Sequence, residues 1–189
     1  MRLPIVLAAT ILLGACSTEE DDGPPPCTAD ANEPNDSAAE ATSLGTLQDD
    51  SVLGQKDAAP KKLFKAFSTH AEGDVDWYTV NVRDTGIGGN PKIGVIVGDG
   101  YEATAFWSCT NGPTELVRCT IGTSVTSDPD MPSAQGCQTV LRGAPEPPRL
   151  AMEIECSGTP TDSGKLLIRV KRSVPSNTCE RYTLFVGVE

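Results

Sequence analysis

Apolar and polar residues alternate along several short segments of the chain, and the alternation is clearest near its end. In 181–189, Tyr182, Leu184 and Val186 fall on one face. A period of two with one apolar face is typical of antiparallel strands that pack on a core. The same period marks 76–82, 92–99, 149–157 and 164–173, with weaker examples at 64–69, 103–109, 115–122 and 137–143.

Turn-forming residues separate these segments. Asp, Asn, Gly and Pro gather at 84–86, 98–100, 111–113 and 162–164, where they supply the backbone conformations that tight turns need. Short strands joined by such turns predict an all-β chain folded as a β-sandwich of about eight strands. The stretch 123–134 lacks alternation and is predicted to be a surface loop.

One short helix is predicted ahead of the strands. Ser37 is followed three residues later by Glu40, which is the spacing of a capping box. In this motif the serine oxygen accepts a hydrogen bond from a free backbone amide at the helix start, and the glutamate side chain accepts one from the backbone amide of the serine. Pro34 keeps Glu33 extended before it. The helix is expected to end before Gly45.

The first 15 residues have the pattern of a signal peptide. Arg2 supplies a positive start, and the apolar segment 3–13 is shorter than the roughly 20 residues of a membrane span. Leu-Gly-Ala-Cys at 13–16 resembles a bacterial lipobox, so residues 1–15 are predicted to be removed and Cys16 to receive a diacylglyceryl group. An ordinary signal peptide with an incidental cysteine is the alternative.

A lipidated Cys16 would anchor the chain in the bacterial cell envelope, on the extracytoplasmic side, because several acyl chains hold stably in a bilayer. Ser17 stands where an Asp would favour the inner membrane, so the outer membrane is expected. Residues 16–26, with STEEDDGPPP after the cysteine, cannot bury apolar area and are predicted to form a solvated tether. Residues 27–189 then form a single domain.

The acidic balance of the chain limits its partners. The formal net charge is −11 over 189 residues. Such a surface argues against nucleic-acid binding, because the phosphates of a nucleic acid need a basic protein surface. It is compatible with cations, or with a protein or polymer ligand at the cell surface.

The cysteines predict disulfides. Seven are present, and an even number remains besides Cys16, which in an exported chain indicates paired thiols. No CxxC spacing occurs, so zinc binding has little support. A Cys109–Cys119 pair is favoured because it closes a short loop, and the other pairings stay open. The expected disulfide cysteines are Cys27, Cys109, Cys119, Cys137, Cys156 and Cys179.

Four motifs together resemble the bacterial pre-peptidase C-terminal (PPC) domain family. They are Glu-Pro-Asn-Asp at 33–36, Gly-Asp-Val-Asp-Trp-Tyr at 73–78, and the final strand patterns at 164–170 and 182–186. The resemblance implies a jelly-roll-like sandwich that extends to the end of the chain. Such domains accompany secreted peptidases, where they bind substrate or aid secretion, so a binding or accessory role is expected.

The same resemblance implies a calcium site. Related collagen-binding domains hold calcium where the N-terminal acidic element meets the loop before the Asp-aromatic strand, and Ca²⁺ takes six to eight oxygen ligands. Ala31 and Gly73 stand where those relatives carry acids, so docking of the two elements without an ion is the alternative. The positions that match are Glu33, Asn35, Asp36 and Asp76, and Asp74 lies nearby, so these five residues are the expected ligands.

Catalytic motifs are weak. Asp-Thr-Gly at 84–86 and Asp-Ser-Gly at 162–164 look like the paired motifs of aspartic peptidases, but their flanks fit turns between strands. His70 is the sole histidine and fits a solvated strand end, and neither HExxH nor GxSxG occurs. A lipid-anchored binding or accessory module without catalysis is therefore expected. The alternatives are a structural envelope lipoprotein without a specific ligand and a divergent hydrolase.

Overall fold

The computed structural model describes residues 28, 30–49, 62–71, 73–84, 90–140, 146–158, 161–174 and 179–188. The predicted signal peptide, Cys16, the tether and Cys27 lie outside these residues. No helix in the described part is long and apolar enough to cross a membrane. The described strands are β1 (Thr42–Gln48), β2 (Lys62–Thr69), β3 (Val75–Arg83), β4 (Lys92–Val97), β5 (Tyr101–Cys109), β6 (Thr114–Ile121), β7 (Thr123–Val125), β8 (Gly136–Gln138), β9 (Arg149–Cys156), β10 (Gly164–Arg172) and β11 (Glu180–Val188).

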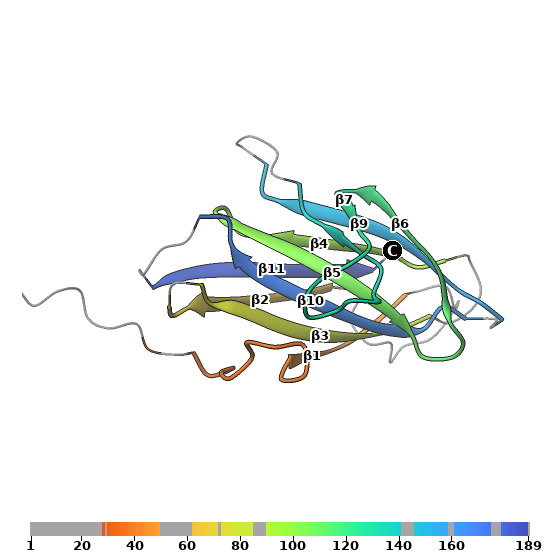
Figure 1. Ribbon diagram of the computed structural model, residues 1–189, viewed down its shortest axis with the longest axis horizontal. Helices are drawn as coiled ribbons and strands as arrows, with labels where there is room; N and C mark the ends of the chain where they lie inside the picture. The colour runs from red at the N-terminus through yellow and green to blue at the C-terminus, as the bar shows by residue number, and fades with distance from the viewer. Residues whose placement is uncertain are drawn as a thin grey trace, which may run out of the picture.

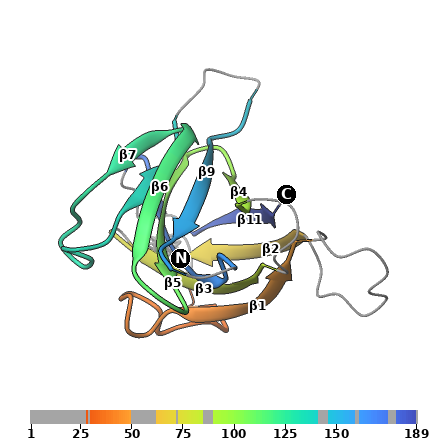
Figure 2. The same cartoon turned by 90° about the vertical axis from the view of Figure 1, so that its right-hand side faces the viewer.

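These strands form two sheets that face one another (Figures 1 and 2). One has the order β1-β3-β10-β5-β8-β7 and the other has the order β2-β11-β4-β9-β6. Every described pair is antiparallel except β1 with β3, which runs parallel. The predicted all-β sandwich is confirmed in this coarse form, with more strands than the expected eight.

The core lies between the two inner faces and follows the alternation of the sequence. Leu166, Ile168 and Val170 of β10 are fully buried and lie in register with β3 on one side and β5 on the other. Leu184 and Val186 of β11 face them from the second sheet. Each such side chain contributes about 1.5–3 kcal/mol through burial, so the strands with the strongest alternation hold the sandwich together.

The predicted N-terminal helix is not confirmed. The Ser37 hydroxyl donates to Oε2 of Glu40 at 2.9 Å, and the Glu40 amide donates to the Ser37 carbonyl at 3.0 Å, which makes one turn. The chain then enters β1 at Thr42 and pairs with β3. The capping signal therefore closes a single turn, because pairing with β3 takes over the backbone groups that a longer helix would use. A further difference is β7, which forms within the predicted surface loop.

The favoured Cys109–Cys119 disulfide is wrong. Cys109 bonds to Cys156, with a Cα–Cα distance of 5.8 Å, and Cys119 bonds to Cys137, with a Cα–Cα distance of 5.7 Å. The prediction assumed a hairpin, but β5 and β6 belong to different sheets, so these two cysteines do not face each other. Both described disulfides join one sheet to the other. Cys179 is also disulfide-bonded.

Candidate metal centre

The N-terminal turn is docked against the strands that carry the second acidic motif. The Trp77 amide on β3 donates to the Asn35 carbonyl at 2.8 Å. The Ser68 amide on β2 donates to Oδ2 of Asp30 at 3.1 Å. These bonds hold the first acidic motif beside the β2–β3 connection, as the resemblance implied for the two motifs. Figure 1 shows this turn, in orange, at the same end of the molecule as the start of β3.

Glu33, His70 and Asp74 converge at this point. Nδ1 of His70 lies 2.9 Å from Oε1 of Glu33 and 3.0 Å from Oδ2 of Asp74. The three potential ligand atoms all lie within 4.8 Å of one another. The His70 amide also donates to Oδ2 of Asp74 at 2.7 Å, which fixes the connection around the carboxylate. Three side chains of metal-binding type therefore share one small volume.

Within the described residues, a carboxylate oxygen of this cluster is buried without a hydrogen-bond partner. The side chains of Asp74 and Glu33 are only 1% and 9% exposed. Oδ1 of Asp74 makes no hydrogen bond in the described part of the chain, and the described contacts of Nδ1 of His70 are those to Oε1 of Glu33 at 2.9 Å and Oδ2 of Asp74 at 3.0 Å. Buried polar atoms are normally paired, and leaving one unpaired costs about 1–3 kcal/mol. A bound cation would satisfy this oxygen.

Asp76 forms the inner wall of the cluster. It is fully buried, faces the space between the sheets, and accepts a hydrogen bond at 2.6 Å from the Tyr182 hydroxyl of the opposite sheet. The Asn35 side chain lies 3.1 Å from both Oε2 of Glu33 and Oδ1 of Asp76, and because both are acceptors we assign the amide nitrogen to this side. We call Glu33, Asn35, His70, Asp74 and Asp76 the acidic centre.

Burial and mutual repulsion disfavour negative charge in the acidic centre. Burial raises the pKa of Asp76 to about 7, with further increases from the nearby carboxylates of Asp74 and Glu33, although the Tyr182 hydrogen bond acts in the opposite direction. Burial also raises the pKa of Glu33. A divalent cation would offset both effects, because an opposite charge close by favours the ionised carboxylate.

The donor set fits a divalent cation. Carboxylate and carbonyl oxygens are the ligands that Ca²⁺ prefers, whereas an imidazole nitrogen suits zinc and other transition metals. Glu33 and Asp74 provide oxygens, and His70 provides one nitrogen. The oxygens of Asp76 accept from Tyr182 and from the Asn35 amide. The three converging residues therefore fit an ion of either kind.

Four of the five residues predicted as ligands lie together: Glu33, Asn35, Asp74 and Asp76. Asn35 turns its amide nitrogen to the carboxylates, so in this arrangement it offers a hydrogen-bond donor and not an oxygen ligand. Asp36 is exposed, and its charge contributes to raising the pKa of Glu33. Calcium itself stays a prediction.

His70 was not among the predicted ligands. It was interpreted as a solvated strand end, but its side chain is three-quarters buried between two carboxylates, with 26% of it exposed. The available signal was its spacing, because His70 and Asp74 lie four residues apart around the second acidic motif. Tyr182, far along the chain, gave no local signal at all.

The two peptidase-like tripeptides also meet in space. Oδ2 of Asp84 accepts the Asp162 amide at 2.6 Å, and Oδ1 of Asp162 accepts the Cys156 amide at 2.6 Å. The Ser163 hydroxyl accepts the Asp84 amide at 3.0 Å. Each aspartate thus accepts a hydrogen bond from a backbone amide next to a strand. The rest of the first motif lies outside the described residues.

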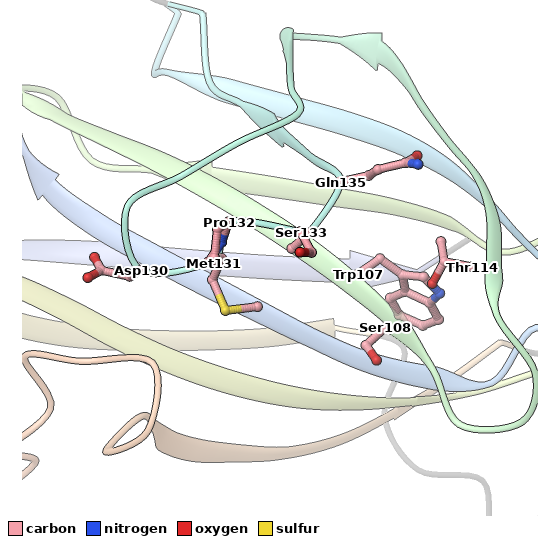
Figure 3. Close-up of a pocket in the computed structure, with 9 residues that line it drawn as sticks. Trp107, Ser108, Thr114, Asp130, Met131, Pro132, Ser133 and Gln135 are labelled. Carbon is pink, nitrogen blue, oxygen red and sulfur yellow. The ribbon is translucent and has the colours of Figure 1, made fainter.

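A hollow of about 480 Å³ lies at another place, beside the end of β5. Figure 3 shows the loop from Asp130 to Gln135 crossing above Trp107 and Ser108. Trp107 is only 3% exposed, and its indole nitrogen donates to Sγ of Cys109 at 3.3 Å. The hollow therefore offers mainly loop side chains and no cluster of charged groups comparable to the acidic centre.

Comparisons with known proteins add a distant likeness to a solved structure. No model of a known protein family matches the sequence, and no curated protein matches it. Among solved structures, the crystal structure of Aeromonas hydrophila PliG, a periplasmic lysozyme inhibitor of g-type lysozyme, matches at 13% identity with a TM-score of 0.31. The match covers 79% of this chain and 99% of that chain. A likeness at this level carries no argument about what this chain binds.

Proposed function

We propose that the chain is a lipid-anchored extracytoplasmic binding or accessory module, without catalytic machinery of its own. Its sandwich would be a jelly-roll-like PPC domain. The lipobox before Cys16 and the acidic tether support anchoring in the envelope, most simply in the outer membrane. The disulfides that join the two sheets support an oxidising, extracytoplasmic location.

One observation carries the proposal: side chains that could ligate a metal ion converge where the N-terminal turn meets the sandwich, and Oδ1 of Asp74 among them is buried without a hydrogen-bond partner in the described part of the chain. A divalent cation bound there would link Glu33 of the turn to Asp74 of the domain. The end of the tether would then be fixed in one orientation to the sandwich. Such a link suits a module that presents a rigid surface at a set distance from the membrane.

The roles of the two buried aspartates at the opposite turn also support a non-catalytic function. Asp84 and Asp162 each use a carboxylate oxygen to accept a hydrogen bond from a backbone amide. An aspartic peptidase needs two carboxylates free to share a proton and activate water. A turn-stabilising role therefore accounts for these residues better than hydrolysis does.

Calcium binding is tested by thermal denaturation of the full chain carrying Cys16→Ser, with calcium or with a chelator. We expect calcium to raise the melting temperature, since a ligand at 100 times its Kd adds about 2.7 kcal/mol of stability. Asp74→Asn should abolish the shift. Asp130→Asn, at an exposed acid that is not part of the acidic centre, should keep it. Equal melting temperatures in calcium and chelator would reject the calcium site.

His70 distinguishes the kind of ion. With calcium bound through oxygens, His70→Gln should retain most of the calcium-induced shift. With a transition metal bound through Nδ1, the same variant should lose a shift that zinc or manganese produces in the unsubstituted chain.

The lipid anchor is tested separately. The chain should partition with membranes, and Cys16→Ser should release it to the soluble fraction.

A further inference from the structure

The outer face of the five-stranded sheet holds a trough of about 320 Å³. It crosses the strands β2, β11, β4, β9 and β6 at the end of the sheet near Val188. This volume lies at the lower end of the range of small-molecule sites, about 300–1,000 Å³. The trough lies on the face that points away from the core, so it is separate from the acidic centre.

The floor of the trough is made by small residues that lie side by side. Gly187 of β11 is paired with Gly94 of β4, and Gly94 is paired with Ala151 of β9. A Cβ atom placed on Gly94 meets nothing within 4 Å, so open space lies directly above the strand. Glycine in the middle of a strand weakens it, and it often marks a place where a ligand approaches the backbone closely.

One wall of the trough is apolar. Phe185 and Ile96 are paired neighbours on β11 and β4, and each lies two residues from the floor glycine of its own strand. Phe64 on β2 is paired with Phe185 and is 67% exposed, which extends the apolar surface beyond the trough. Ile121 closes the far end.

Every charged side chain that lines the trough is a cation, although the chain as a whole has a net charge of −11. The three are Lys62, Lys92 and Arg149. Two of them have acidic partners: Nζ of Lys92 lies 3.8 Å from Oε1 of Glu153, and Nη2 of Arg149 lies 3.3 Å from Oε2 of an exposed Glu146. Nε of Arg149 is buried without a hydrogen-bond partner in the described part of the chain.

The lining offers a ligand little besides apolar contact and positive charge. Its one hydroxyl, on Thr120, already donates to the Ala151 carbonyl at 3.3 Å. A sugar or a peptide presents many polar groups, which this surface would leave unpaired at a cost. A molecule with one anionic head and an otherwise apolar body would leave none unpaired.

We propose that this trough binds a medium-chain fatty acid, with the acyl chain on the glycine floor and the carboxylate among Lys62, Lys92 and Arg149. Charge complementarity selects the head, because a carboxylate meets cations here while most of the surface repels it. The open space above Gly94 favours a narrow, flexible tail.

The test is calorimetric titration of the full chain carrying Cys16→Ser with sodium decanoate below its micellar concentration. We expect saturable binding of one decanoate per chain. Decanol, which lacks the charge, and decyltrimethylammonium, which reverses it, should bind at least tenfold more weakly. Absence of saturable decanoate binding, or equal binding of all three compounds, would overturn the proposal.

Two variants locate the site. Gly94→Val fills the open space above the floor, should leave folding intact, and should weaken decanoate binding at least tenfold. Its control is Asn81→Leu, which places an apolar side chain at an exposed position of β3 in the other sheet and should leave binding unchanged. Lys92→Gln combined with Arg149→Gln should also weaken binding at least tenfold, whereas Lys165→Gln on β10 should not.

Other occupants give different results. If a second copy of the chain fills the trough, sedimentation should show a dimer that Gly94→Val abolishes, and decanoate should not bind to the monomer. If an acidic peptide is the ligand, decanoate binding should be absent while a glutamate-rich peptide binds. Either result would overturn the fatty-acid assignment.

Discussion

Tyr182 of β11 donates its hydroxyl proton to Oδ2 of Asp76 on β3 over 2.6 Å, and this buried hydrogen bond joins the two sheets beside the acidic centre. The Tyr78 hydroxyl lies 2.6 Å from that of Tyr182, so two phenols connect the core to the carboxylate. Because burial and the nearby charged groups raise the pKa of both phenols, they stay protonated and able to donate.

Tyr182→Phe should destabilise the protein by about 1–3 kcal/mol, because it leaves a buried oxygen of Asp76 without its donor. Urea denaturation in chelator measures the loss. Tyr78→Phe removes the neighbouring hydroxyl but leaves the bond to Asp76, so its loss should be smaller. Equal losses for the two variants would contradict the assigned direction of the Tyr182 hydrogen bond.

The stability of the metal-free protein should fall as the pH rises toward about 7. Burial raises the pKa of Asp76 from its ordinary 3.8 to about 7, so the folded state holds a proton that the unfolded state releases. The resulting stabilisation is present below about pH 4 and is lost as pH rises through the folded pKa, by about 1.4 kcal/mol per unit of pKa difference.

Urea midpoints between pH 5 and pH 8 in chelator measure this dependence. Asp76→Asn should flatten it, because an amide does not titrate. The groups that act on Asp76, namely Asp30, Glu33, Asp74 and Tyr182, are retained in that variant. The prediction is wrong if the slope is the same with and without the Asp76 carboxyl.

Gly164→Ala should destabilise the sandwich by about 1–3 kcal/mol through overpacking. An added Cβ would lie 2.3 Å from Cζ2 of Trp107 and 2.5 Å from the Ser108 carbonyl oxygen, closer than atoms can approach. Gly94→Ala is the matched control, since its Cβ meets nothing within 4 Å, and it should be neutral or stabilising. Thermal denaturation of both variants distinguishes steric clash from a general effect of losing glycine.

Asp84→Ala should cost about 1–3 kcal/mol, because the Asp162 amide then loses its acceptor in a buried turn. Asp162→Ala should cost a similar amount through the Cys156 amide. Asp130→Ala, at an exposed position, should be nearly neutral. If the first two variants unfold no more easily than the third, the two aspartates have a role other than supporting the turn.

The sequence predicts the central strands well because the apolar residues that alternate along them are the same residues that are buried in the core. The segment 164–173 became β10 (Gly164–Arg172), whose apolar side chains fill the core. The first strand escaped prediction for a local reason. In β1 the register shifts between Ser43 and Thr46, where Gly45 adopts a positive φ of 108°, so Leu44 and Leu47 do not follow a period of two.

The candidate site was predicted through its motifs and completed by the fold. Glu33 and Asp76 were recognisable because each belongs to a short acidic motif. His70 and Tyr182 join them only through the packing of β2 and β11, and no local pattern records such a contact. The Cys109–Cys119 pairing failed for the same kind of reason, since the short connection between these residues crosses from one sheet to the other.

The parallel pairing of β1 with β3 has a mechanical consequence. The bond from the Trp77 amide to the Asn35 carbonyl precedes this pair, and the bond from the Asp49 amide to the Arg83 carbonyl follows it. A pull on the chain from its N-terminal side would act along β1. The hydrogen bonds to β3 would then be loaded together in shear and would not open one at a time, so the strand nearest the tether resists extension as a unit.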